Sequence, residues 1–109
     1  MSIEFHVSAE LRPWPAKKEL AACLQAAGLQ ISVGIYSIRI KGSSFIFQEY
    51  GGDLGDPMLV SDALNLTEMI NDASWLSEAL TKADLTHRIE VFEVSADGET
   101  MVAHFHYKC

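Results

Sequence analysis

At residues 66–83 the chain reads LTEMINDASWLSEALTKA, and its apolar positions recur at intervals of three and four residues. This spacing places them along one side of an α-helix. We therefore predict a long amphipathic helix between Ser61 and Ala83, capped at its start by Asn65 or Thr67. Its apolar stripe consists of Leu66, Met69, Ile70, Ala73, Leu76, Leu80 and Ala83.

The residues before this helix predict a β-hairpin and a loop. Residues 30–41 alternate like a strand, but the phase of the alternation changes at Gly34, where we expect a bulge or a break. A turn at 42–44 and a second strand at 45–50 complete the hairpin. The segment 51–57 then combines three glycines with two aspartates and a proline, which is typical of a connecting loop.

The N-terminal part predicts a strand followed by a first helix. Residues 3–8 alternate between apolar and polar side chains, as a half-buried strand does. Pro15 stands where the first turn of a helix tolerates a missing N–H, and Gly28 is typical of a C-terminal cap. Trp14 is interpreted as a lid over the end of this helix, with an interface anchor as the alternative.

The C-terminal part predicts a second hairpin. Its strands at 86–95 and 100–107 flank a turn that contains Asp97-Gly98. The first of these strands carries apolar residues on both faces, as a central strand would. Simple alternation along the second strand places Met101, Ala103, Phe105 and Tyr107 on one face, and Val102, His104, His106 and Lys108 on the other.

These elements follow one another in the order β-α-β-β-α-β-β. The order predicts an α+β fold in which an antiparallel sheet of about five strands carries both helices on one face. Such an arrangement resembles the ferredoxin-like fold with an extra strand. A chain of 109 residues accommodates one domain, and we take residues 1–109 as that single domain.

The net charge of −7 is concentrated in one part of the chain. Residues 49–84 contain eight acidic residues and one basic residue, whereas the rest of the chain has seven of each. An acidic surface of this kind attracts a basic partner, although charged runs also serve solubility alone. The residues predicted to contact such a partner are Glu49, Tyr50, Asp53, Asp56, Asp62, Glu68 and Asp72.

Composition argues against several classes of protein. Hydrophobic residues make up 49% of the chain and charged residues 21%, as in a globular domain rather than a disordered tail. A pI of about 4.9 argues against direct binding of nucleic acid or of an anionic membrane. No apolar run is long enough to span a bilayer, and the N-terminus lacks the pattern of a secretory signal, so we expect a cytoplasmic protein.

Three histidines are weak candidates for a metal site. His104 and His106 project side by side from one face of the last predicted strand, and His6 joins them only if the first and last strands lie close. The same open face of the sheet is expected to carry Glu4 and Ser8. Because exposed strand histidines are common, we expect no metal and no cofactor.

Patterns that would indicate catalysis are missing from the sequence. Cys23 lies on the apolar side of the first helix and Cys109 is the last residue, so neither has the setting of a nucleophile. The loop at 51–57 lacks the Gly-Lys-Ser/Thr ending of a phosphate-binding loop and the acidic spacing of a calcium loop. We therefore expect a protein without enzymatic activity.

These features predict a small acidic interaction protein that binds and neutralises a basic protein. It resembles in type the bacterial immunity proteins, or antitoxins, which are cytoplasmic α/β inhibitors of toxins, and a toxin nuclease is then the expected partner. Phage-type inhibitors and secretion chaperones with the same acidic face are alternatives. A further alternative is a small-ligand or metal-binding enzyme that uses the open sheet face. We expect a monomer or a homodimer.

Overall fold

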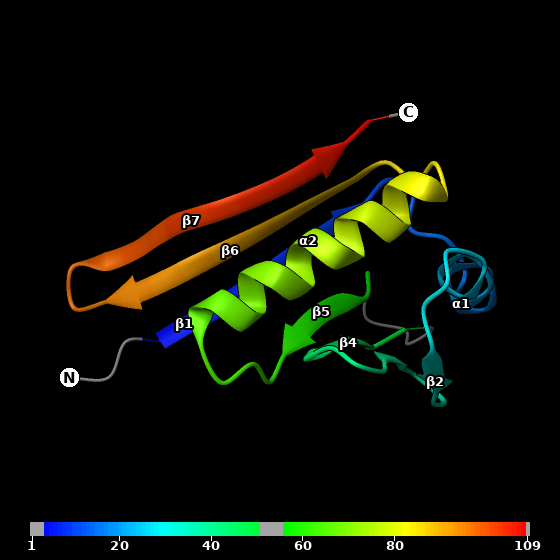
Figure 1. Ribbon diagram of the computed structural model, residues 1–109, viewed down its shortest axis with the longest axis horizontal. Coiled ribbons are helices and arrows are strands. Elements are labelled where there is room, and N and C mark those ends of the chain that lie inside the picture. The colour runs from blue at the N-terminus through cyan, green and yellow to red at the C-terminus, as the bar shows by residue number, and fades with distance from the viewer. Residues whose placement is uncertain (1–3, 51–55, 109) are drawn as a thin grey trace.

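The computed structural model describes residues 4–50 and 56–108. Within these ranges the chain forms two helices and seven strands, which together make an α+β fold (Figure 1). In chain order the elements are β1 (Glu4–Leu11), α1 (Lys17–Ala26), β2 (Ile31–Val33), β3 (Ile38–Ile40), β4 (Phe45–Gln48), β5 (Met58–Ser61), α2 (Leu66–Lys82), β6 (His87–Ser95) and β7 (Gly98–Tyr107).

The strands form two antiparallel sheets rather than one. One sheet has the strand order β1-β6-β7 and the other has the order β2-β3-β4-β5. β1 also contacts β5, so the two sheets adjoin each other along these strands. The α+β class is therefore confirmed. The ferredoxin-like topology is not, because seven strands in two sheets replace the predicted sheet of about five strands.

Short strands account for the difference in strand number. The predicted strand at 30–41 divides into β2 and β3 around Gly34, which confirms the expected break. The backbone N–H of Gly34 donates to the carbonyl oxygen of Ser37 at 2.9 Å and closes a tight turn between the two strands. β5 has no counterpart in the sequence-based prediction, because four residues directly after Pro57 are too few to show a periodic pattern.

Helix α2 begins at Leu66, within the predicted span, and Asn65 is its cap. The Asn65 side chain accepts a hydrogen bond from the backbone N–H of Glu68 at 2.8 Å, and the Glu68 carboxylate accepts one from the N–H of Leu64 at 3.0 Å. Both bonds satisfy backbone donors at the helix start. The helix packs on β6 and β7. Its buried residues are Met69, Ala73, Leu76, Ser77, Ala79 and Leu80.

Helix α1 packs elsewhere. Ala16 at its start provides no side-chain cap, and Gly28 follows its end with a φ of +94°, a conformation that favours glycine. Leu20 and Leu24 on this helix are buried, and the helix contacts β2 and α2. The two helices therefore pack mainly on different sheets, which corrects the expectation that both cover one face of a single sheet.

The three-stranded sheet has one face covered by α2 and one open face. In the register of β6 and β7, Val91 pairs with Ala103 and Phe92 pairs with Met101, so Val102 is an extra residue in β7. The extra residue reverses the alternation at this point. Met101 therefore lies on the open face with Phe92, and not on the same face as Ala103, where simple alternation placed it.

One hydrophobic core joins both sheets and both helices. Burial of each large apolar side chain stabilises the fold by roughly 1.5–3 kcal/mol. Neither helix of the described chain is long and apolar enough to cross a membrane. The largest fully buried side chains are Leu11, Leu20, Leu24, Ile38, Ile40, Phe45, Phe47, Met69, Leu76, Leu80, Ile89 and Val91.

Candidate functional site

Two of the predicted partner-binding acids stabilise the fold. The Asp72 carboxylate accepts hydrogen bonds from the backbone N–H and from the hydroxyl of Ser44, at 2.9 Å and 2.6 Å. These bonds tie the middle of α2 to the residue just before β4. Glu68, as described above, caps the start of α2. Both acids are half-buried, so we assign them to folding rather than to a partner.

A third predicted acid, Asp62, is exposed but lies apart from the loop at 51–57. It directly follows β5, and its backbone N–H donates to the carbonyl oxygen of Ser44 at 3.0 Å. Its carboxylate lies 3.6 Å from the Arg39 guanidinium and is 67% exposed, so the ion pair is a weak surface pair. Asp62 and the acids beside the loop therefore lie at opposite ends of the four-stranded sheet.

Tyr50 is buried, which corrects its prediction as part of a binding surface. Its side chain is in the core, and its hydroxyl donates to the carbonyl oxygen of Pro15. Its ring lies edge-on to those of Trp14 and Phe47, with centroids 6.1 Å and 6.5 Å away. Burial raises the pKa of Tyr50 to about 12. Trp14 is half-buried in this cluster, which favours its structural interpretation over that of an interface anchor.

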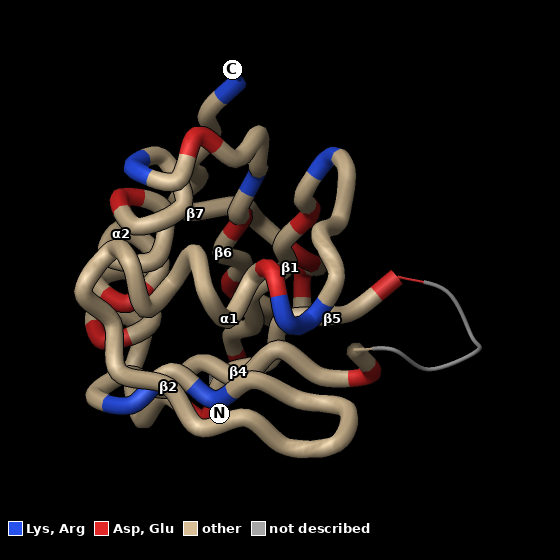
Figure 2. The backbone as a smooth tube through the Cα atoms, turned by 90° about the vertical axis from the view of Figure 1, so that its right-hand side faces the viewer, with Lys and Arg blue, Asp and Glu red and all other residues tan. Residues whose placement is uncertain are grey.

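Glu49 and Asp56 are the predicted acids that stay exposed beside the loop. They lie at the end of β4 and just before β5, on either side of residues 51–55, and acidic positions are visible at both points in Figure 2. Neither makes an ion pair or a side-chain hydrogen bond with another described residue. Asp53 lies outside the described residues.

Exposed apolar side chains also lie at this end of the four-stranded sheet. Val33 ends β2, Ile35 and Tyr36 form the connection to β3, and Met58 begins β5. Their exposed fractions are 52%, 81%, 59% and 46%. The backbone N–H of Tyr50 donates to the carbonyl oxygen of Tyr36 at 2.9 Å, which places this connection beside the end of β4.

The antiparallel strand order places these residues at one end of the sheet, which holds the end of β2, the start of β3, the end of β4 and the start of β5. β2 and β5 are the two edges of the sheet, and the strand register puts Val33 and Met58 on opposite faces. The turn between β2 and β3 is also anchored. The Lys17 ammonium donates to the carbonyl oxygens of Gly34 and Ile35 at 2.6 Å and 2.5 Å. We call the resulting region the acid-rimmed surface and define it by Val33, Ile35, Tyr36, Glu49, Asp56 and Met58.

The sequence identified the acids of this surface but not its apolar members. Ile35 and Tyr36 fit the strand pattern of residues 30–41, so they were indistinguishable from strand residues that face a core. The phase change at Gly34 is the one local signal, because a break there places the residues between the two strands outside the sheet.

The histidines share an open face, as predicted, but within the described ranges they do not come together as three ligands. His104 and His106 have parallel rings with centroids 5.4 Å apart. His6 lies two strands away on β1, where its ring stacks on Phe92 and its Nε2 lies 2.5 Å from the Glu99 carboxylate. Among the described residues, no three His, Cys, Asp or Glu side chains lie close enough to hold a metal ion.

A buried histidine–serine pair has no counterpart in the sequence-based prediction. The Nδ1 of His87 lies 2.8 Å from the carbonyl oxygen of Leu85, and its Nε2 lies 2.7 Å from the Ser77 hydroxyl. Because a carbonyl only accepts, Nδ1–H donates to Leu85 and Nε2 accepts from Ser77. Burial lowers the pKa of His87. The available signal was that His87 is in phase with the apolar positions Ile89 and Val91.

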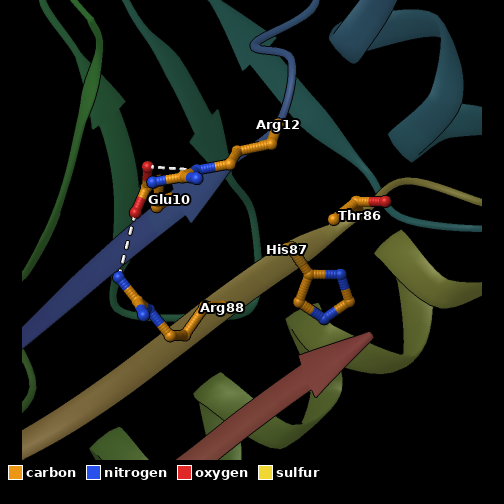
Figure 3. Close-up of a pocket in the computed structure, with 5 residues that line it drawn as sticks. All are labelled: Glu10, Arg12, Thr86, His87 and Arg88. Carbon is orange, nitrogen blue, oxygen red and sulfur yellow. Dashed lines mark hydrogen bonds and ion pairs between the residues drawn. The ribbon is translucent and has the colours of Figure 1, made fainter. Parts of the chain in front are cut away.

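Beside this pair lies a hollow of about 200 Å³ lined by Glu10, Arg12, Thr86, His87 and Arg88 (Figure 3). Glu10 accepts hydrogen bonds from Arg12 at 2.7 Å and from Arg88 at 3.0 Å. The bond from Arg12 is the main reason that the pKa of Glu10 is lowered. The His87 ring points away from these charged side chains (Figure 3). Among the residues that line the hollow, Glu10 and His87 could exchange protons. Both are already hydrogen-bonded to other residues of the protein.

Comparison with known proteins gives no match to this chain among family models, curated proteins or solved structures. The acid-rimmed surface is therefore interpreted from its own chemistry.

Proposed function

We propose that this protein is a small binding protein, without enzymatic activity, that binds and neutralises a basic protein through the acid-rimmed surface. One observation carries the proposal. Four large apolar side chains, and two acids that have no ion-pair partner among the described residues, are exposed at the same end of the four-stranded sheet. Apolar residues bordered by charge are the usual composition of a protein interface.

The apolar members supply the contact area. Tyr36 is exposed next to Ile35, and tyrosine is among the residues that contribute most to binding energy when an interface forms. The bonds from Lys17 and between Gly34 and Ser37 hold the turn that carries both side chains. An anchored turn loses little conformational entropy on binding, so more of the contact energy is available for affinity.

The acids select the partner. Glu49 and Asp56, which have no ion-pair partner among the described residues, lie at the same end of the sheet as the apolar side chains, in the segment that accounts for the net charge of −7. Such a rim speeds association with a basic surface and disfavours an acidic one. A toxin nuclease presents a basic surface where it binds nucleic acid. Immunity against such a toxin is therefore the specific function that we propose within this class.

The experiment uses the full chain as bait in its native cells, followed by kinetics with the captured protein. We expect a partner with a basic surface. Replacing Glu49→Gln and Asp56→Asn together should slow association about tenfold at low salt and flatten its salt dependence. Tyr36→Ala should instead accelerate dissociation, with an affinity loss of about 30-fold.

The matched control is the double variant Glu78→Gln/Asp97→Asn, which removes two exposed acids from α2 and from the turn between β6 and β7. It should bind the captured protein as the unmodified chain does. If the control and the surface variants bind equally well, the acid-rimmed surface is not the binding site and the proposal fails.

A further inference from the structure

β7 is an open edge of the three-stranded sheet. The order β1-β6-β7 leaves one side of β7 without a neighbouring strand among the described residues. In Figure 1, β7 runs along one margin of the molecule, and no described element lies beyond it. Residues Gly98–Tyr107 contain neither proline nor lysine, which commonly protect such edges from pairing, and the bulge at Val102 lies before the stretch 103–107. The strand is therefore free to pair with another strand.

Two histidines on this edge strand have the spacing of metal ligands. His104 and His106 are exposed, and neither makes a hydrogen bond or ion pair with another described residue. Zinc lies about 2.0–2.1 Å from a ring nitrogen, so two rings that share an ion have centres within about 6 Å of each other. The observed separation of 5.4 Å fits that limit. Two ligands are half of the usual four.

A second copy of the chain supplies the missing ligands. We propose that two copies pair antiparallel through β7, with the two-fold axis at Phe105, and that His104 and His106 of both copies bind a zinc-class divalent ion. This register places His104 of each copy directly opposite His106 of the other. Side chains directly opposite each other on antiparallel strands have Cβ atoms about 4.5–5.5 Å apart. All four imidazoles then lie on one face.

The other face of the strand fits the same register. Phe105 lies opposite its own copy, and Ala103 lies opposite Tyr107 of the second copy. These residues are half-buried in the monomer and form apolar cross-strand pairs in the dimer. A two-fold axis at His106 would instead place His104 opposite Lys108, whose positive charge repels a metal ion. The register centred on Phe105 is thus favoured on both faces.

The electrostatic surroundings also permit the site. The net negative charge of the protein belongs to residues 49–84, which include α2 on the opposite face of β7 from the histidines, and Asp84, whose carboxylate accepts a hydrogen bond from the Tyr107 hydroxyl. On β6, Glu90 lies directly opposite His104, where a carboxylate can orient the imidazole of a ligand. Arg88, opposite His106, lies near the carboxylates of Glu10 and Glu90 at 3.0 Å and 3.5 Å, which neutralise its charge.

The test is light scattering coupled to size-exclusion chromatography of the full chain, first with EDTA and then with zinc as the probe. We expect a monomer of 12.0 kDa in EDTA and a doubled mass in zinc, with one zinc ion bound per two chains. A chain that stays monomeric in zinc, or that binds one zinc per monomer, would overturn the proposal.

Variants test the ligands and the register. His104→Ala and His106→Ala should each weaken zinc-dependent dimerisation at least about tenfold. His6→Ala, on the same face but on β1, is the control and should leave dimerisation unchanged. His104 and His106 are exposed, so the melting temperatures of their variants in EDTA should match that of the unmodified chain and verify folding. That of His6→Ala, which loses its contacts with Glu99 and Phe92, should be only slightly lower.

A mixture of the two single variants distinguishes this register from others. A mixed dimer retains one His106 directly opposite one His104, whereas neither variant alone can form that pair. The mixture should therefore bind zinc more tightly and dimerise more strongly than either variant by itself. A mixture that behaves like the separate variants, or a dimer that survives the loss of both histidines, would refute the proposed site.

Discussion

His87 starts β6 in phase with Ile89 and Val91, so its imidazole is directed into the core beside α2. The ring is buried, with Nδ1 hydrogen-bonded to the Leu85 carbonyl oxygen and Nε2 to the Ser77 hydroxyl, and burial disfavours its charged form. Burial is the largest cause of its lowered pKa, and the nearby His106 lowers the pKa further. The ring of Tyr107 stacks on it with centroids 6.2 Å apart. Protonation of His87 would place a charge inside the core.

The stability of the protein should therefore depend on pH near neutrality. The folded pKa of His87 lies below its ordinary value of 6.5, so the unfolded chain binds more protons once the pH falls below that value. The contribution of the neutral His87 ring to the free energy of unfolding is complete above about pH 6.5, and it is lost as the pH falls toward the pKa of the folded protein. We expect the free energy of unfolding in urea to decrease from about pH 7.5 to pH 5.5, with at most about 1.4 kcal/mol per pH unit from this one proton.

The double variant Ser77→Ala/His87→Leu provides the control, because it removes the titrating ring and its serine partner together, and the Leu85 carbonyl oxygen loses its donor equally at every pH. Its stability should change less over the same pH range. The exposed histidines are present in both proteins, so their contribution to the pH dependence of stability cancels when the two are compared. Equal slopes for the two proteins would show that His87 is not the cause.

At the scale of elements, α2 illustrates how a local pattern becomes a buried surface. Its apolar residues recur every three or four positions, which aligns them on the side that packs on β6 and β7. Asn65 sets where the helix begins, and Asp72 then links the helix to Ser44. The helix therefore connects the three-stranded sheet to the four-stranded one.

The cap of α2 can be tested by substitution. Asn65→Ala should lower the free energy of unfolding by about 1 kcal/mol, because the N–H of Glu68 loses its acceptor. Thr67→Ala, two residues further on, should change it by less than about 0.5 kcal/mol. Chemical denaturation measures both values. A larger loss for Thr67→Ala than for Asn65→Ala would mean that the cap is assigned to the wrong residue.

At the scale of the whole molecule, the two sheets depend on one another. Val7, Ile89 and Val91 of the three-stranded sheet belong to the same buried cluster as Phe45 and Phe47 of the four-stranded one. If one sheet unfolded alone, the apolar side chains that the other sheet contributes to this cluster would be exposed to water. The chain should therefore fold as one cooperative unit.

The two tryptophans of the chain report on this cooperativity. Trp14 packs against Phe47 and Tyr50 of the four-stranded sheet region, whereas Trp75 lies on α2, with its ring beside Gly42 in the turn between β3 and β4. The variants Trp14→Phe and Trp75→Phe each leave one fluorescent reporter. Within each variant, we expect the unfolding midpoints from fluorescence and from far-UV circular dichroism to coincide. Separate midpoints would show that the two sheets unfold independently.

Local patterns predicted much of the fold. The periodicity of α2, the Asp97-Gly98 turn and the phase change at Gly34 all involve residues within one or two turns of each other, and each corresponds to an observed feature. The division into two sheets was not predictable in this way. It depends on pairs such as Glu4 with Val94, which are far apart in the chain.

The same distinction applies to the candidate site. The sequence located the acidic segment. Tyr50 and Asp72 do not belong to the surface, however, because they are hydrogen-bonded to Pro15 and Ser44, which are far from them in the chain. Ile35 joined the surface because the break at Gly34 exposes it.

Hydrophobic periodicity and turn chemistry thus specified the helices, the hairpins and the acidic segment, since these signals act between near neighbours. Tertiary contacts alone determined which strands share a sheet, which acids are free to bind and which histidines lie on an open edge. Burial and strand pairing depend on contacts between segments that are far apart in the chain, and no single stretch of sequence predicts which segments will make those contacts.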